Sequence, residues 1–133
     1  MGIMDGDPEL EEFATKLFGL ARAGDTEALR AYVEAGVPVD LTNGKGDTLL
    51  MLAAYYGHAE TVRMLVTSGA DPNRANDRGQ TPLAGAVFKK ESAVVRALLD
   101  AGADPHAGQP SALETARMFA NDQFIQWFTQ SDS

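Results

Sequence analysis

Few side chains in this sequence could take part in catalysis or bind a metal. The chain contains no cysteine and two histidines, His58 and His106. An activated nucleophile needs a base beside it, and His58 follows a glycine between two expected helices, where a capping or turn role is favoured. Asp104, His106 and Glu114 could be imagined as metal ligands, but their spacing matches no recognised pattern. We therefore expect no catalytic residue, no metal and no cofactor, and we interpret the chain as a non-enzyme.

Internal repeats supply the elements that position the side chains. The segment Gly46–Asp71 reads GDTLLMLAAYYGHAETVRMLVTSGAD, and Gly79–Asp104, 33 residues later, reads GQTPLAGAVFKKESAVVRALLDAGAD. The positions that keep their residue type include Gly46 and Gly79, Thr48 and Thr81, Leu50 and Leu83, Ala53 and Ala86, Val62 and Val95, and Leu65 and Leu98. A 33-residue period with a T-P-L-x-x-A core is the ankyrin signature. The chain therefore resembles an ankyrin-repeat protein.

Each repeat has the residues that a helix–turn–helix unit needs. Thr48 and Thr81 can cap a first helix, Pro82 suits a first helical turn, and Gly57 can end that helix in a left-handed conformation. A second helix follows with an apolar stripe at helical spacing. Helix starts are expected near Pro8, Thr26, Thr48, Ala59, Thr81, Ser92, Ser111 and Asn121. Because one unit cannot bury its own apolar face, stacking of neighbouring units must form the core.

The resemblance implies an all-α fold, an ankyrin-repeat solenoid of about four helix-turn-helix repeats with short hairpin-like tips and atypical terminal capping repeats. We expect one domain over residues 1–133, with residues 1–7 frayed and repeats at about 8–42, 43–75, 76–108 and 109–130. The first helix is longer than in a normal repeat and should form the N-terminal cap. Three residues are missing after Asp104 in the last repeat, so the loop that follows should be tight.

Composition narrows the function classes. The net charge of −8 argues against general nucleic-acid binding, which depends on neutralising phosphates with Lys and Arg. No apolar run approaches the ~18 residues of a membrane span, and the acidic N-terminus lacks the apolar region of a secretory signal. We expect a soluble, cytoplasmic monomer with no nucleic acid or membrane as partner. Short arrays of this kind resemble ankyrin proteins of bacteria.

The resemblance also indicates a binding face. Ankyrin proteins usually meet partners with their hairpin tips and the inner surface of their first helices, and the period maps these positions onto this sequence. Bulky side chains recur there in register, and basic residues surround them. The predicted protein-binding residues are Lys45, Tyr55, Tyr56, Arg78, Phe88, Lys89, Met118 and Phe119. Aromatic residues with arginine are typical of interface hot spots. The alternative is that these rings pack on neighbouring repeats and the charges form a solvated rim.

The leading interpretation is a non-enzymatic protein–protein interaction module, an adaptor or regulator, whose partner carries an acidic patch. An alternative with the same surface is an inhibitor or immunity-type protein that blocks one enzyme. An enzyme is a third hypothesis, for which the sequence offers no site. Self-assembly is a fourth, indicated only by Trp127 and Phe128 at an open end of the solenoid.

Overall fold

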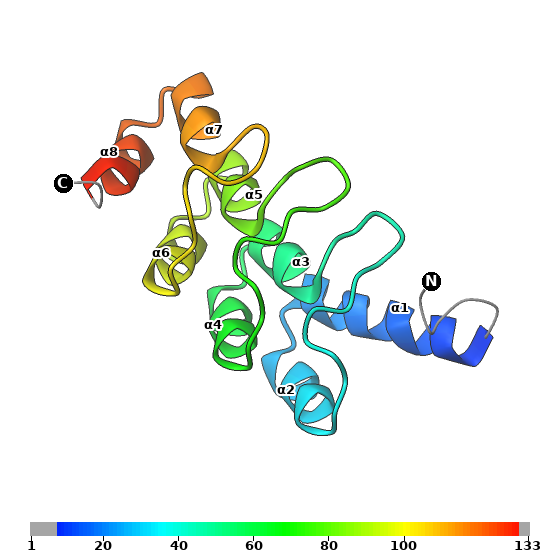
Figure 1. The fold of residues 1–133 in the computed structure, drawn as a ribbon. Helices are drawn as coiled ribbons and strands as arrows, with labels where there is room; N and C mark the ends of the chain where they lie inside the picture. The colour runs from blue at the N-terminus through cyan, green and yellow to red at the C-terminus, as the bar shows by residue number, and fades with distance from the viewer. Residues whose placement is uncertain (1–7, 131–133) are drawn as a thin grey trace.

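The computed structural model describes residues 8–130, so the predicted fraying of residues 1–7 lies outside the described residues. Within residues 8–130 the chain forms eight α-helices in four antiparallel pairs (Figure 1). The helices are α1 (Pro8–Ala23), α2 (Thr26–Glu34), α3 (Leu49–Tyr55), α4 (Ala59–Thr67), α5 (Pro82–Phe88), α6 (Ser92–Asp100), α7 (Ala112–Met118) and α8 (Asp122–Gln130). Each begins within one residue of its predicted start, and the all-α solenoid is confirmed.

The helices form two rows. Figure 1 shows the first helices of the pairs, α1, α3, α5 and α7, side by side in one row, and α2, α4, α6 and α8 in the other. Long loops join each pair to the next and project to one side of the first row. The ends of α3, α5 and α7 therefore lie next to one another along the array, beside the projecting loops.

Short polar side chains fix where the first helices begin. The hydroxyls of Thr48, Thr81 and Ser111 accept hydrogen bonds from the backbone N–H three residues further on, at 3.0, 3.1 and 3.1 Å. At Ser111 the cap is reciprocal, because the Glu114 carboxylate accepts the Ser111 backbone N–H at 2.8 Å. This hydrogen bond lowers the pKa of Glu114. The caps keep successive first helices in the same register.

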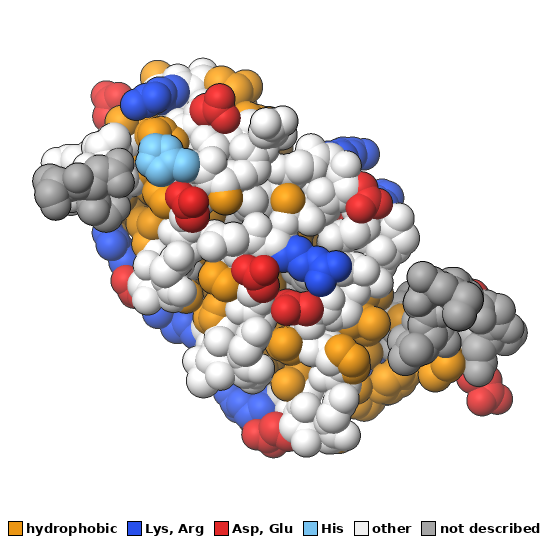
Figure 2. Space-filling model, viewed as in Figure 1, with side chains coloured by type: hydrophobic (Ala, Val, Ile, Leu, Met, Phe, Trp, Pro, Cys, Tyr) orange, Lys and Arg blue, Asp and Glu red, His pale blue; other side chains and the backbone are white. Residues whose placement is uncertain are grey.

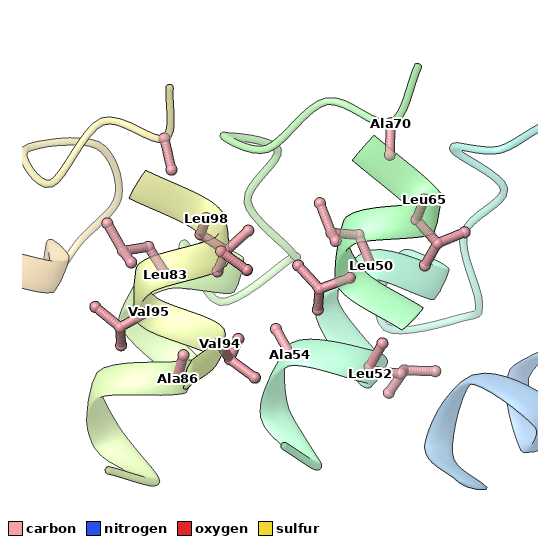
Figure 3. Close-up of a cluster of buried hydrophobic side chains, with 14 of the residues drawn as sticks. Leu50, Leu52, Ala54, Leu65, Ala70, Leu83, Ala86, Val94, Val95 and Leu98 are labelled. Carbon is pink, nitrogen blue, oxygen red and sulfur yellow. The ribbon is translucent and has the colours of Figure 1, made fainter. Parts of the chain in front are cut away.

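The core lies between the two rows. Leu50, Leu65, Leu83 and Leu98, which recur at the 33-residue period, are at most 1% exposed and form part of this core. Figure 3 shows these side chains between the helices of the second and third repeats, with alanines such as Ala54 between them. Burying a leucine side chain stabilises a fold by about 1.5–3 kcal/mol. The repeated leucines therefore stabilise the stack from one unit to the next.

The two ends of the array are less completely covered. In α2, Leu29 is buried but Tyr32 and Val33 are half-buried. In α8, Phe124 and Phe128 are buried, whereas Ile125 is half-buried. Terminal units have a neighbour on one side, which accounts for this exposure. The guanidinium carbon of Arg96 lies 4.2 Å from the centre of the Trp127 ring and covers part of the last helix.

His58 links the first two repeats. It occupies the N-cap position of α4, but its side chain makes no capping hydrogen bond. Its Nε2 lies 2.7 Å from the Arg22 carbonyl oxygen, to which it donates. The ring also lies against Gly24, where an added Cβ would be 2.4 Å from His58 Nδ1. His58 thus has a structural role, as expected. Its side chain joins two repeats by a hydrogen bond and does not cap a helix.

Candidate functional site

The predicted binding residues fall at equivalent places on three helices. Tyr55, Phe88 and Met118 are the last residues of α3, α5 and α7, and Tyr56, Lys89 and Phe119 are the C-caps that follow them. The large hydrophobic side chains that remain exposed are Tyr56 at 49%, Phe88 at 49%, Met118 at 69% and Phe119 at 48%. Tyr55 is half-buried. Because the first helices are stacked in register, these side chains form a row along the array.

Lys45 and Arg78 lie in the tips of the first two long loops, where asparagines set the turns. The Asn43 Oδ1 accepts the backbone N–H groups of Lys45 and Asp47 at 2.9 and 3.0 Å. The Asn76 Oδ1 accepts the backbone N–H groups of Arg78 and Gln80 at 2.9 and 3.1 Å. Both tips therefore have the same shape, which places the two cations at equivalent positions.

Backbone hydrogen bonds join the tips to one another. The Asp77 N–H donates to the Lys45 carbonyl at 3.0 Å, and the Gln109 N–H donates to the Gly79 carbonyl at 2.9 Å. The third loop, predicted to be tight, thus contacts the second tip although it is three residues shorter. Residues of all three tips therefore line a common surface together with the ends of the first helices.

Two adjoining grooves run between the tips and the first helices. The first groove has a volume of about 600 Å³, and the second about 280 Å³. The first groove is lined by Arg22, Asn43, Gly44, Lys45, Asp47, Met51, Leu52, Tyr55, Tyr56, Asn76, Arg78, Gln80 and Phe88. The second is lined by Arg78, Gln80, Ala84, Phe88, Gln109, Pro110, Thr115, Met118 and Phe119. Since Arg78, Gln80 and Phe88 line both, the grooves form one surface.

The first groove is positively charged although the protein is acidic. Its lining has three cations, Arg22, Lys45 and Arg78, and one carboxylate, Asp47, which accepts a hydrogen bond from Asn76 Nδ2 at 2.9 Å. None of the three cations forms an ion pair with any residue that the structure describes. On the face shown in Figure 2, acidic and basic side chains are interspersed. The groove therefore presents unneutralised positive charge.

The rings of the row also contact one another. Tyr55 and Tyr56 pack edge to face with centroids 5.5 Å apart, and Phe88 and Phe119 do so across repeats at 5.6 Å. Lys89 Nζ lies 5.1 Å from the centre of the Tyr55 ring. Lys89 lines neither groove; it covers Tyr55 instead. Seven of the eight predicted residues thus line the grooves.

Other lining residues were not predicted as site residues. Met51 forms part of the floor of the first groove, and Gly85 makes room for it, because an added Cβ there would lie 2.9 Å from Met51 Cε. Gly85 therefore allows close packing inside α5, although glycine costs about 1 kcal/mol relative to alanine in a helix. Pro110 lines the second groove from the third loop. In the sequence, the one feature that marked Pro110 was its place directly before Ser111, the residue that caps α7.

The residues considered as metal ligands, Asp104, His106 and Glu114, do not form a metal-binding cluster in the described structure. Across residues 8–130, no three His, Asp or Glu side chains come together as metal ligands. The backbone N–H of His106 donates to Asp104 Oδ1 at 2.9 Å, which is turn geometry. None of the eight helices described has both the length and the apolar character needed to span a membrane.

Comparisons with known proteins identify the family. The family model for ankyrin repeats (3 copies) matches residues 17–109, and the chain belongs to this family. An ankyrin repeat protein of Pseudomonas aeruginosa is 50% identical over 51 residues, which is 38% of this chain and 30% of that protein. The crystal structure of the human ASB11 ankyrin repeat domain superposes with a TM-score of 0.75 and 26% identity. That match covers 88% of this chain and 54% of the ASB11 chain, so this chain spans about half its length. Ankyrin repeats are generally non-enzymatic protein–protein interaction modules.

Proposed function

We propose that this chain is an adaptor or regulator that binds a protein partner in the two grooves. The observation that carries the proposal is the row of exposed rings and Met118 beside three cations that form no ion pair within residues 8–130, on a protein whose net charge is −8. Exposed contiguous apolar groups are uncommon on a monomer unless a partner covers them. Tyr and Arg are also the residues that most often contribute binding energy in interfaces.

The surface is also rigid enough to recognise a partner. The first helices are capped, the tips are joined by backbone hydrogen bonds, and the row of rings is held partly by contacts within itself. A preorganised surface loses little conformational freedom on binding, so more of the contact energy appears as affinity. We further propose that the chain acts as a cytoplasmic monomer, which accords with a composition that lacks disulfides.

The test is capture of partners from cells that make this protein, with matched variants. A Tyr56→Ala, Phe88→Ala double variant removes two exposed rings, so it should keep its melting temperature within a few degrees and lose the captured partner. Removal of hot-spot rings makes the free energy of binding less favourable by about 2 kcal/mol or more. The control is Glu60→Ala with Thr67→Ala, two exposed residues of α4 outside both grooves.

The control variant should capture the same proteins as the wild type. If the ring variant unfolds, the rings belong to the core and the proposal is wrong. If it stays folded and captures every partner normally, recognition lies outside the grooves. A captured enzyme whose activity is abolished in a one-to-one complex would instead assign the inhibitor role.

A further inference from the structure

We propose that the grooves bind an extended segment of the partner that carries an acidic residue and, about five or six residues away, a large apolar residue. This inference rests on the proposed function and adds the chemistry of the partner. The acidic residue lies in the first groove near Arg22 and Lys45, and the apolar residue fills the second groove beside Met118 and Phe119.

Charge complementarity assigns the first groove to a carboxylate. Three cations and one carboxylate line it, and that carboxylate already accepts a hydrogen bond from Asn76. The cations come from three different elements, α1 and two loop tips, and they converge on one groove. A partner's Asp or Glu would gain charge-assisted hydrogen bonds from this set. A partner with Lys or Arg at that place would be repelled.

The second groove differs in size and in lining. Its volume of about 280 Å³ is at the lower limit of ligand pockets, about 300–1,000 Å³, and suits one large side chain. Its apolar lining comes from Ala84, Phe88, Pro110, Met118 and Phe119. Met118 is the most exposed of these hydrophobic side chains, and methionine adapts readily to the shape of an apolar partner. An apolar anchor such as Leu or Phe is therefore expected here.

The spacing follows from the repeat geometry. The acidic residue lies near the Lys45 tip, which leads into α3, and the apolar residue lies at the end of α7, with α5 between them. Packed helices have axes about 8–10 Å apart, so these two places are two helix spacings, or about 16–20 Å, apart. An extended chain advances about 3.3 Å per residue, so about five or six residues separate the acidic residue from the apolar residue.

Single-stranded nucleic acid is the other ligand that aromatic rings and cations can bind. The protein's own charge disfavours it, because nucleic-acid affinity depends on neutralising many phosphates and this chain carries an excess of eight negative charges. A short acidic segment needs only a few local cations. We therefore assign the grooves to a peptide segment.

The experiment measures binding of the folded full-length chain to ten-residue peptides in a Gly-Ser background. Each peptide carries one Glu and one Leu separated by two to eight positions, in both orders. Binding should be strongest when the two are five or six positions apart, in one order. Replacing Glu by Gln in that peptide should weaken binding about threefold to fivefold, as expected for exposed ion pairs. Replacing Leu by Ala should weaken it about tenfold or more. Binding that is independent of spacing would overturn the proposal.

Mutant cycles test which groove holds which residue. The effect of the peptide's Glu-to-Gln change on the binding free energy should be coupled to that of Lys45→Gln and additive with that of Met118→Ala. The effect of the peptide's Leu-to-Ala change should be coupled to that of Met118→Ala and additive with that of Lys45→Gln. Coupling in the opposite sense, or tighter binding of a ten-nucleotide single-stranded oligonucleotide, contradicts the assignment. If a captured protein partner is lost from the Tyr56→Ala, Phe88→Ala variant but no peptide binds, the proposed function stands and the peptide inference fails.

Discussion

Replacing Gly24 by alanine should destabilise the fold more than the same change at Gly69. Both glycines have left-handed φ angles, +74° and +102°. An added Cβ at Gly24 would be 2.4 Å from Nδ1 and 2.5 Å from Cγ of the His58 ring, whereas at Gly69 it would meet no atom within 4 Å. Gly69→Ala therefore measures the cost of the left-handed backbone conformation, and Gly24→Ala measures that cost together with the cost of moving the His58 ring.

The two costs can be estimated separately. A left-handed alanine costs about 1–2 kcal/mol, offset by about 0.4–1 kcal/mol because alanine restricts the unfolded chain. Gly69→Ala should therefore cost about 0.5–1 kcal/mol. At Gly24 the ring must also move, which breaks its 2.7 Å hydrogen bond to the Arg22 carbonyl and costs about 1 kcal/mol more. Gly24→Ala should thus cost about 1.5–2 kcal/mol.

Urea unfolding followed by circular dichroism gives the free energy of unfolding for each variant. The same two changes are then made in a His58→Ala background, where no ring opposes the new Cβ. There the two alanine substitutions should have equal effects within the error of the measurement. Equal effects in the wild-type background would refute the link between repeats that we assign to His58.

Three further predictions concern the fold. Leu65→Ala should cost about 2–5 kcal/mol because Leu65 is fully buried, and an unchanged melting temperature would show that it is not a core residue. Lys90 has a φ of +60°, so Lys90→Gly should raise the melting temperature by up to a few degrees; a fall would mean that Lys90 is not strained. The Ser111 N–H lowers the pKa of Glu114 below its ordinary value of 4.5, so its stabilising effect is present above that value and lost as the pH falls through the lowered pKa. Glu114→Gln should therefore lose less stability between about pH 6 and pH 3 in urea titrations, and an unchanged acid dependence would argue against the capping box.

Local signals were sufficient to predict the helices and the core. Each start has a short-range cause, such as the hydroxyl of Thr48 or Thr81 capping the helix that follows. Each core leucine repeats at the period of the fold, and neighbours one period apart must stack. Seven of the eight predicted site residues line the grooves for the same reason, because register in the sequence becomes proximity along the array.

Contacts between repeats were not predictable from those signals. The hydrogen bond of His58 to the Arg22 carbonyl joins residues 36 positions apart, and Lys89 lies over the Tyr55 ring. Side-chain directions of this kind depend on the three-dimensional spacing of the repeats, which the period alone does not specify.

Site-specific photo-crosslinking tests partner binding in the grooves most directly. Phe88 lines both grooves, whereas Thr67 is exposed at the end of α4 and lines neither. Each is replaced in turn by the photoreactive benzoylphenylalanine, and cells that make the protein are irradiated. We predict a covalent adduct with a partner protein from position 88 and none from position 67. An adduct from position 67 alone, with the position 88 variant folded, would contradict binding in the grooves.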